Sequence, residues 1–486
     1  MHTPSLERFL QQATDQRQPV WVEILADLDT PLSAYWKLAH DQEFSFLLES
    51  VTGGEQVGRY SFIGINPLDI FRSKNGAHRW EKGVFTDTSC KDPLDNLNKA
   101  LKTLDIATPE GFPRFFGGAV GMIGYDYVRF LENLPDSLPD PLNVDDVAMM
   151  ICETVVVFDH ARNSVKVIAL AEPTQAGYEK AQSEINVIIK KLKSPLPELP
   201  NKTVPTEQIE PTSNLTQPEF ETMVRKVQEY IAAGDGIQMV LSQRFTRASE
   251  VHPISAYRAI RQLNPSPFLF LLRFGDFDLV GASPELLVGL EQRKATVRPI
   301  AGTRPRGKTE LEDKQFAEDL LASEKERAEH IMLVDLGRND LGRVCEIGTV
   351  KPDKIMTIER YSHVMHLVSD VHGKLRGDLN CMDLVRATFP AGTLSGAPKV
   401  RAMEIIEELE TSRRGAYGGA IGFFCPNGDT ELAITIRSIT LKDGMAHVQA
   451  GAGLVYDSDP TEEYLETLNK AGAPLAALRL AEKGLE

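Results

Sequence analysis

The sequence predicts a fold that mixes α-helices and β-strands in at least two structural units. The chain has 486 residues, whereas a single domain usually has about 100–200. Short apolar runs bounded by glycine, proline and asparagine are typical of strands, and apolar residues at helical spacing are typical of amphipathic helices. Both patterns occur on each side of a proline-rich segment, so the boundary between the units is expected there.

The first part of the chain is predicted to consist mainly of strands. Residues 18–75 contain short apolar runs with turn residues between them. One of these runs ends in Glu49 and Ser50, just before the glycine pair 53–54, which predicts a turn. Polar residues at the end of a buried strand are usually structural, and the pattern alone gives these two no other role.

A hairpin and two helices are predicted around the middle of the chain. Residues 154–158 and 165–170 are rich in valine and isoleucine and flank a polar turn, which indicates a β-hairpin. A helix is expected after it, up to Lys193. A second helix is expected after Thr216, because a capping-box pattern precedes apolar residues at helical spacing and Gly234 closes the run.

The segment between these helices is a predicted linker. It is rich in proline and poor in apolar residues, so it is not expected to pack into a core. We therefore divide the chain into an N-terminal domain at 1–195, a linker at 196–213 and a C-terminal domain at 214–486.

The chemistry of the chain is concentrated in residues 299–343, which predict a Gly/Pro/Arg loop followed by a long acidic helix. Glu326 and Glu329 are three residues apart and so share one face of that helix. Glu463 and Glu466 form a second such pair. Two facing pairs would offer oxygen ligands suited to Mg²⁺. In a chain that is 25% charged, a solvated helix face is the other reading of each pair.

The same stretch contains a pattern of the phosphate-binding loop, because residues 302–309 fit GxxxxGK[ST]. That loop needs successive inward N–H groups, whereas Pro305 has none and restricts Arg304. The apolar run before Asp335 continues a helical pattern, so the second strand of a nucleotide hydrolase is not indicated. A nucleotide hydrolase therefore remains only an alternative.

The later segments predict further strands and one candidate acid. Glu285 follows a proline and precedes a buried run, so its pKa can be raised by desolvation, as a general acid requires; a strand-end glutamate without a role is the alternative. A loop of small residues at 389–398 leads into an amphipathic helix. Strands are expected at 415–424 and 430–441, and a glycine-rich bend at 449–460.

Composition narrows the possible classes of protein. The net charge of −16 argues against nucleic acid or an anionic membrane as the main partner. Neither a secretory signal nor an apolar run of membrane-spanning length is present, so a cytoplasmic location is expected. Five cysteines without paired spacing fit a reducing compartment and predict no zinc site or disulfide framework.

Several ordered motifs resemble those of the chorismate-utilising enzymes, specifically of anthranilate synthase large subunits, over nearly the whole chain. The motifs are LLES (47–50), PIAGTRPRG (299–307), ERAEHIMLVDLGRNDLGRV (326–344), YSHVMHLVS (361–369), GTLSGAPK (392–399), GAYGGAIG (415–422), IRS (436–438), QAGAG (449–453) and ETLNKA (466–471). The resemblance implies an α+β fold of two large antiparallel β-sheets packed face to face, with outer helices and the active site in the cleft between domains.

The resemblance also implies an activity and a set of site residues. Chorismate and ammonia would give anthranilate and pyruvate with Mg²⁺, the first committed step of tryptophan biosynthesis. Glu285 would protonate the leaving 4-hydroxyl, and His366, with Thr393 beside it, would help remove the carbon-2 proton. The implied metal ligands are Glu326, Glu329, Glu463 and Glu466. The implied substrate-binding residues are Gly302, Thr303, Tyr417, Arg437, Gly451, Ala452, Gly453 and Lys470.

Two positions distinguish the activities found within this family. Aminodeoxychorismate synthases typically carry a nucleophilic lysine where this chain has Ala301. Isochorismate and salicylate synthases typically carry a water-activating lysine where it has Gln238. Both differences favour ammonia as the direct nucleophile. Aminodeoxychorismate synthase, a nucleotide hydrolase and a non-catalytic protein that binds tryptophan or chorismate remain the alternatives.

The resemblance further implies a partner and an inhibitor. No cysteine lies in the G-x-C-x-G context of a glutaminase nucleophile, so a separate glutaminase subunit is expected, in a heterotetramer with two copies of each chain. Ser50 with Pro267, Phe268 and Leu269 would form a tryptophan feedback site between the domains. A vestigial pocket is the alternative, because Phe268-Leu269 replaces the commoner Tyr-Met.

Overall fold

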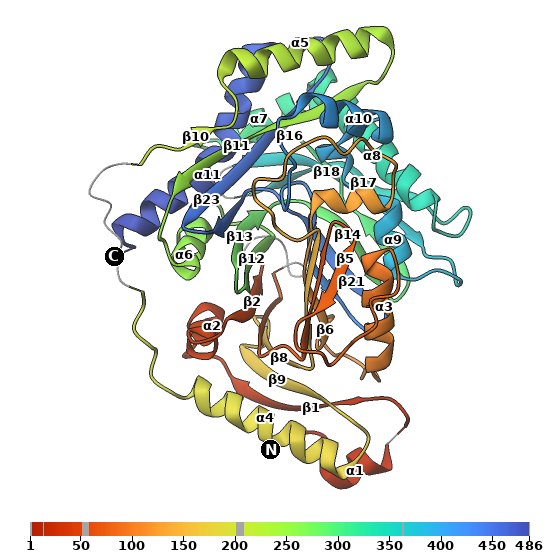
Figure 1. Cartoon of the computed structure of the whole chain (residues 1–486), viewed down its shortest axis with the longest axis vertical. Helices are drawn as coiled ribbons and strands as arrows, with labels where there is room; N and C mark the ends of the chain where they lie inside the picture. Colours follow the sequence, from red (N-terminus) through yellow and green to blue (C-terminus); the bar gives the residue numbers. More distant parts are fainter. Residues whose placement is uncertain (1, 13, 51–57, 201–208, 362–363, 486) are drawn as a thin grey trace.

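Two antiparallel β-sheets form the centre of the structure, which is a computed structural model that describes residues 2–12, 14–50, 58–200, 209–361 and 364–485 (Figure 1). Every strand pairing within the sheets is antiparallel. The expected α+β fold with two large antiparallel sheets is therefore confirmed.

Among the residues that the structure describes, the first sheet has 12 strands, with residues 18–25 at one edge and residues 212–213 at the other. In spatial order its strands are β1 (Gln18–Leu25), β9 (Ser164–Ala171), β8 (Thr154–Asp159), β3 (Tyr60–Ile65), β2 (Phe44–Glu49), β12 (Phe268–Phe274), β13 (Phe277–Ser283), β22 (Ser438–Lys442), β23 (Met445–Leu454), β11 (Gln238–Ala248) and β10 (Thr212–Ser213), with β19 (Gly396–Ala397) beside β11.

The second sheet has 11 strands. In spatial order these are β16 (Ile300–Pro305), β18 (Val364–Lys374), β15 (Lys294–Val297), β14 (Leu286–Glu291), β21 (Thr430–Ile434), β20 (Ala420–Phe424), β6 (Gly118–Ile123), β7 (Val147–Cys152), β4 (Asp69–Lys74) and β5 (Ala77–Trp80), with β17 (Lys351–Arg360) beside β18.

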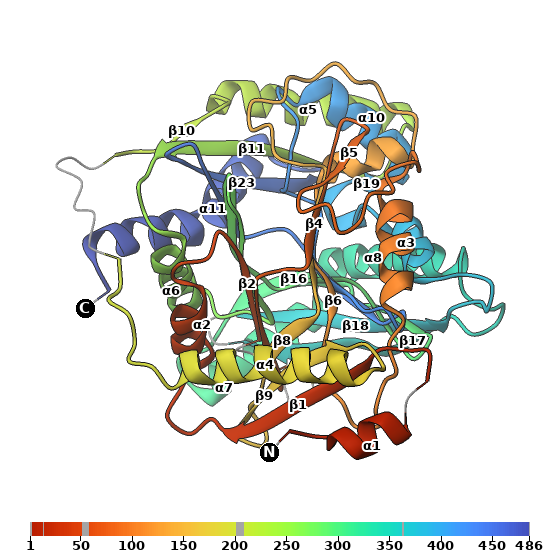
Figure 2. The same cartoon turned by 60° about the horizontal axis from the view of Figure 1, so that its bottom comes forward.

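Helices lie on the outside of both sheets (Figures 1 and 2). They are α1 (Leu6–Gln11), α2 (Pro31–Ala39), α3 (Pro93–Leu104), α4 (Gln175–Leu192), α5 (Gln217–Ala233), α6 (Pro253–Leu263), α7 (Glu310–Ala322), α8 (Glu324–Gly342), α9 (Cys381–Thr388), α10 (Lys399–Leu409) and α11 (Pro460–Lys483), with two 3-10 turns, η1 (Tyr125–Phe130) and η2 (Gly392–Leu394). Within the described ranges, no helix combines the length and the apolar character needed to cross a membrane.

The facing sides of the two sheets share one apolar core. Phe46 and Phe270 of the first sheet and Val120 and Phe423 of the second are buried in it. The Phe270 ring lies over Gly281 of the neighbouring strand, where an added Cβ would come within 2.2 Å of the ring. The alternation of side chains along each strand thus gives the sheets an inner apolar face and an outer face for the helices.

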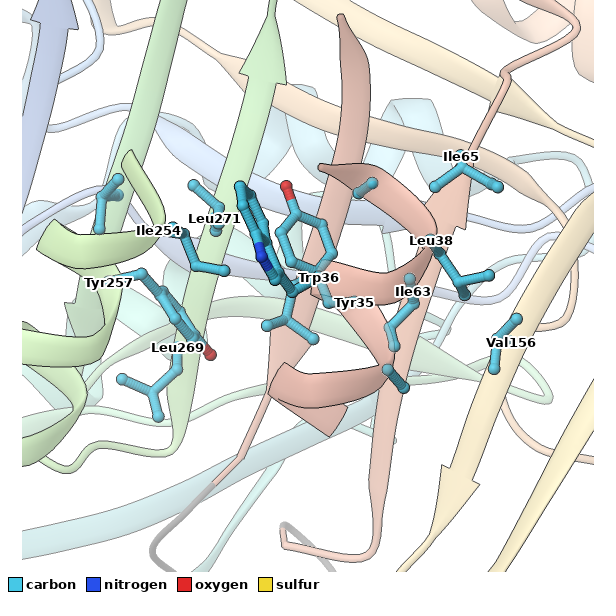
Figure 3. Close-up of a cluster of buried hydrophobic side chains, with 14 of the residues drawn as sticks. Tyr35, Trp36, Leu38, Ile63, Ile65, Val156, Ile254, Tyr257, Leu269 and Leu271 are labelled. Atoms are coloured by element: carbon cyan, nitrogen blue, oxygen red, sulfur yellow. The ribbon is translucent and has the colours of Figure 1, made fainter. Parts of the chain in front are cut away.

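The outer face of the first sheet is covered by α2, α4, α6 and α11. Figure 3 shows part of this core, in which Tyr35 and Trp36 of α2 lie close to Ile254 and Tyr257 of α6. A second outer core, around α5 and α10, covers β11 and β23. Helices α3, α8 and α9 cover the second sheet.

Both sheets contain strands from both of the predicted domains. In the first sheet β2 pairs with β12, and in the second sheet β6 pairs with β20. The division at 1–195 and 214–486 therefore does not separate the sheets, and it stays a prediction about domains. Part of the predicted linker, 201–208, and the predicted turn at 53–54 lie outside the described residues.

Several local predictions are confirmed. The hairpin is β8 and β9, joined antiparallel. The helix before the linker is α4, which ends at Leu192 with Lys193 as its C-cap. The helix after the linker is α5, with Thr216 at its N-cap in a capping box and Gly234 at its C-cap with φ 90°. The run before Asp335 lies in helix α8, as expected.

Four segments differ from prediction. The expected Gly/Pro/Arg loop contains strand β16, because pairing with β18 supplies hydrogen bonds that its own sequence does not specify; residues 302–309 therefore cannot form a phosphate-binding loop. The expected bend at 449–460 begins within the long strand β23. The expected single strand at 430–441 is two strands, β21 and β22, that belong to different sheets. The expected long acidic helix is also divided, at Ser323, into α7 and α8.

Candidate active site

The predicted site residues Glu285 and Arg437 lie where the chain passes from one sheet to the other. Glu285 lies between β13 of the first sheet and β14 of the second. Arg437, with φ 52°, lies between β21 of the second sheet and β22 of the first. Two backbone hydrogen bonds join the crossings, from Ile434 N to Glu285 O (3.0 Å) and from Ala282 N to Arg437 O (3.2 Å). The crossings therefore hold an acid and a cation close together.

Glu285 is a half-buried carboxyl with one hydrogen-bond donor from a distant loop. The Thr393 hydroxyl donates to Glu285 Oε1 at 3.1 Å, and both residues line a cavity of ≈ 50 Å³. Burial raises the pKa of Glu285 to about 8, although the hydrogen bond from Thr393 and the charge of Lys470 lower it. Glu285 therefore carries its proton at neutral pH and can act as a general acid.

His366 lies on β18 opposite Thr303 of β16, at a bulge that contains Gly302. Its Nδ1 is 2.9 Å from the Gly302 carbonyl oxygen and 3.1 Å from the Thr303 hydroxyl. Because a carbonyl only accepts, Nδ1 carries the proton in that bond, which leaves Nε2 as an acceptor. Burial lowers the pKa of His366. The ring is therefore neutral near pH 7 and can accept a proton.

Gly302 is required at this bulge for two reasons. Its φ is 65°, in the left-handed region, and a Cβ would lie 2.9 Å from Glu326 Oε2. The strand that holds His366 in place therefore lies directly against the carboxylates of α8.

The predicted carboxylate-binding segment is strand β23. An added Cβ on Gly451 would be 2.9 Å from the Tyr417 hydroxyl, and one on Gly453 would be 2.5 Å from Gln238 Nε2. Both glycines therefore face the inner side of the sheet. The Ala452 side chain is buried in the outer core on the opposite side, so Ala452 can take part only through its backbone.

Two cations connect this strand to the last helix. Lys470 Nζ donates to the Gly451 carbonyl (3.0 Å) and pairs with Glu466 (2.5 Å). Arg437 Nη1 donates to the Lys470 carbonyl at 2.7 Å. Burial lowers the pKa of Arg437, whose side chain is only partly exposed. This cationic pair is suited to an anionic ligand such as a small dicarboxylate.

The four predicted metal ligands come from two helices, α8 and α11. Burial raises the pKa of Glu329, and the nearby charges of Glu326 and Glu466 raise it further, so these carboxylates face a common space. Glu463 is bound by the Ser458 hydroxyl at 2.7 Å. In the part of the chain that the structure describes, no three His, Cys, Asp or Glu side chains are grouped closely enough to hold a metal ion. The four carboxylates are ligands of the kind that a hard cation prefers, but in this structure they lie too far apart to hold one together.

Two arginines without a predicted role contact this site. Arg304 pairs with Glu326 at 3.1 Å. The guanidinium carbon of Arg414 is 5.8 Å from the centre of the Tyr417 ring. An arginine in a polar strand or loop is common on surfaces, so only the fold reveals these contacts.

The predicted effector residues line a second, larger cavity of ≈ 830 Å³ between the sheets. Ser50, Pro267, Phe268 and Leu269 all contribute to its wall. Pairing of β2 with β12 brings the two segments together. Within the described residues the buried Ser50 hydroxyl makes no hydrogen bond, so it is available to a ligand. The Leu269 side chain packs in the outer core (Figure 3).

Comparison with known proteins identifies the family to which the chain belongs. Residues 43–476 match the chorismate binding enzyme family. The chain therefore belongs to the chorismate binding enzymes, as its motifs had predicted.

Three named relatives are similar to the chain over nearly its whole length. Anthranilate synthase component 1 of Pseudomonas aeruginosa is 47% identical over 492 residues, which cover 99% of each chain. That of Aquifex aeolicus is 46% identical over 477 residues, 96% of each chain. The crystal structure of anthranilate synthase component I from Streptococcus pneumoniae is 38% identical, with a TM-score of 0.78 over 93% of this chain and 98% of that one.

The environment of Glu285 predicts a dependence of stability on pH. Its pKa rises from 4.5 to about 8 on folding, so its contribution is fully present below pH 4.5 and is lost as pH rises through 8. Relative to Glu285→Gln, the wild type should therefore lose stability across this range. The loss should be on the order of a few kcal/mol, since one pKa unit is worth about 1.4 kcal/mol.

Urea unfolding at intervals from pH 5 to about pH 9 measures this difference. Glu318→Gln, a substitution of an exposed residue of α7, is the matched control and should run parallel to the wild type. Parallel curves for Glu285→Gln and the wild type would show that Glu285 is not a protonated buried acid.

Proposed function

We propose that the chain is the large subunit of an anthranilate synthase, which converts chorismate and ammonia into anthranilate and pyruvate with Mg²⁺. The observation that carries the proposal is the pairing of Glu285 with Thr393, near the cations Lys470 and Arg437, in a member of the chorismate binding enzymes. The relatives at 46% and 47% identity, both named anthranilate synthase component 1, support the specific activity.

Binding of chorismate requires donors for two carboxylates. Lys470 and the backbone of Gly451 to Gly453 would face the ring carboxylate. Tyr417 and Arg437 would hold the enolpyruvyl carboxylate, which the buried position of Tyr417 and the proximity of Arg437 to Lys470 support. Gly302 and Thr303 would line the ring. Cations and aligned N–H groups of this kind also stabilise charge that develops as the reaction proceeds.

The two half-reactions need one acid and one base. Ammonia forms a bond to ring carbon 2, and the 4-hydroxyl leaves as water after it takes a proton from Glu285. His366 then accepts the carbon-2 proton, the bond between the ring and the enolpyruvyl oxygen breaks as the ring becomes aromatic, and the departing enolate takes up a proton to give pyruvate. Support comes from the raised pKa of Glu285 and the lowered pKa of His366, which give each group the protonation state that its role requires.

The metal-binding role of the two glutamate pairs is also a proposal. Glu329 and Glu466 would hold Mg²⁺, with Glu326 and Glu463 as ligands or as partners of its waters. When bound, Mg²⁺ would supply positive charge for the ring carboxylate. The effect of Glu326 and Glu466 on the pKa of Glu329 supports a shared site, because like charges this close favour a bound cation.

The main alternative is an aminodeoxychorismate synthase. Ala301 has no nucleophile, and its side chain is buried in strand β16. Gln238 occupies the position of the water-activating lysine of isochorismate and salicylate synthases. It lies beside Gly453 and cannot deprotonate water as a lysine can. Both positions favour ammonia as the nucleophile that attacks directly, and therefore anthranilate as the product.

We also propose a separate glutaminase partner, in a heterotetramer with two copies of each chain, because no cysteine of this chain lies in the sequence context of a glutaminase nucleophile. All five cysteines are free, and four of them, Cys152, Cys345, Cys381 and Cys425, are buried. Burial raises the pKa of the Cys152 thiol to about 12, which leaves it unreactive. Free buried thiols also support the proposed cytoplasmic location.

The chain by itself should use ammonium, and not glutamine, as its source of nitrogen. The purified chain with chorismate, Mg²⁺ and ammonium at alkaline pH should form anthranilate, detected by its fluorescence, and glutamine should give no product above background. Product from glutamine with the homogeneous chain would contradict the need for a partner. Absence of product from ammonium, or turnover of ATP in its place, would contradict the proposed activity.

Loss of a proposed metal ligand should weaken the response of the enzyme to Mg²⁺. Glu329→Gln should raise the Mg²⁺ concentration for half-maximal activity by about tenfold or more, because a proposed ligand of the ion is lost. Glu324→Gln, an exposed position on the same helix, is the control and should leave this concentration unchanged. Equal Mg²⁺ dependence of the two variants would exclude the α8 carboxylates from the site.

The larger cavity supports feedback inhibition by tryptophan. It offers an apolar wall that includes Phe268, together with the Ser50 hydroxyl, which makes no hydrogen bond within the described residues. These groups suit the indole ring and the polar end of an amino acid. Because both sheets line the cavity, a ligand there can change how the sheets lie relative to each other.

A bulky side chain in the larger cavity should weaken inhibition by tryptophan. Tryptophan should inhibit the wild type, and Ser50→Phe should raise the inhibitory concentration by about tenfold or more, since an added ring in the pocket costs about 1–3 kcal/mol of binding. The KM for chorismate should stay nearly constant. Ser183→Phe on the exposed side of α4 is the control. Full sensitivity of Ser50→Phe, or an uninhibited wild type, would remove this assignment.

A further inference from the structure

Arg414 is a buried arginine in the loop between α10 and β20. It is 2% exposed, and it pairs with Glu410, which is 5% exposed. Arg414 Nη2 lies 2.6 Å from Glu410 Oε1, and Arg414 Nε lies 3.0 Å from Glu410 Oε2. Burying two charges is costly unless further hydrogen bonds satisfy them, so the other contacts of this pair are informative.

Those contacts join three separate segments of the chain. Arg414 Nη1 donates to the Leu394 carbonyl at 2.6 Å, and Nη2 donates to the Val240 carbonyl at 2.7 Å. Glu410 accepts from the backbone N–H and the hydroxyl of Ser242, at 2.9 and 2.8 Å. The pair therefore connects the 3-10 turn η2, strand β11 and the loop that precedes β20.

Each of these segments carries a residue of the proposed chorismate site or pairs with a strand that does. Leu394 follows Thr393, which donates to Glu285. Val240 lies opposite Gly453 in the pairing of β11 with β23. Tyr417 follows Arg414 in the same loop, and the guanidinium carbon is 5.8 Å from the centre of its ring. The acid, the carboxylate-binding strand and the tyrosine thus share one buried support.

We propose that Arg414, held by Glu410, is a positioning residue that fixes the Thr393–Glu285 pair relative to strand β23 and Tyr417. The inference rests on the proposed function, because it names what orients that site. Arg414 does not contact the substrate in this role, since its side chain is buried and donates to Glu410 and to the Leu394 and Val240 carbonyls. Only an arginine can serve all these acceptors together, because its planar guanidinium presents five N–H donors and lysine has one point charge.

The same strand offers a matched control for a purely structural role. Arg247, near the other end of β11, is 3% exposed and pairs with Glu482 of α11 through Nη2, at 2.7 and 2.8 Å. Its backbone partner in β23 is Ala446, far along the strand from Gly453. Arg247→Lys therefore disturbs a buried ion pair of the same kind without reaching the site.

The experiment compares Arg414→Lys with Arg247→Lys in the full-length chain, with Mg²⁺, chorismate and a constant concentration of free ammonia at each pH. Arg414→Lys should lower kcat by about 10- to 100-fold, because small displacements of catalytic groups have effects of this size. The KM for chorismate should change less. The alkaline limb of the pH profile of kcat should also move, because Glu285 loses its fixed donor.

Arg247→Lys should keep kcat and the alkaline limb near those of the wild type, even where its Tm falls as far as that of Arg414→Lys. Equal behaviour of the two variants, at equal loss of Tm, would overturn the proposal. A wild type that forms no anthranilate would instead refute the proposed function, so the two failures are distinguishable.

A double variant covers the case in which Arg414→Lys folds poorly. Arg414→Met alone leaves the Glu410 charge buried and unpaired, whereas Arg414→Met with Glu410→Met removes both charges. The double variant should therefore recover Tm relative to the single variant, while kcat stays low because Leu394 and Val240 still lack their donor. Recovery of kcat together with Tm would show that the pair only stabilises the fold.

Discussion

The hydrogen bonds that join the two sheet crossings are the constraint on which the rest of the site depends. Ile434 N bonds to Glu285 O and Ala282 N bonds to Arg437 O, so the two points at which the chain changes sheets are held side by side. An acid and a cation are thereby placed at the seam between two rigid sheets, a scaffold that holds catalytic groups more precisely than free loops can. The apolar core between the sheets keeps this seam fixed.

Burial at that seam sets the chemistry of the side chains. Glu285 becomes a carboxyl that keeps its proton near pH 7, whereas His366, also partly buried, becomes a neutral ring. Desolvation disfavours the charged form of each group. One physical cause therefore keeps Glu285 protonated, so that it can donate a proton, and His366 unprotonated, so that it can accept one. Close carboxylates on α8 and α11 bring negative charge together at the same place, which a cation can offset.

Sequence patterns were sufficient where local forces decide the structure. Helix α5 was predicted with both caps, and the β8–β9 hairpin was predicted from its alternation. Prediction failed where distant partners decide it. Residues 430–441 resemble one strand, yet Arg437 takes a φ of 52° and the two halves join different sheets. Residues 300–305 contain glycine and proline, yet β18 recruits them as a strand.

The sequence by itself determined which chemical groups are available: carboxylate pairs at helical spacing, no lysine at 301 or 238, and motifs that identify the family. Only the tertiary structure decided which of these groups meet. Thr393 reaches Glu285 across 108 residues, and Glu49 meets Tyr257 across 208. The reason is physical: strand pairing and burial depend on non-local contacts, and a pKa depends on the surroundings that those contacts create.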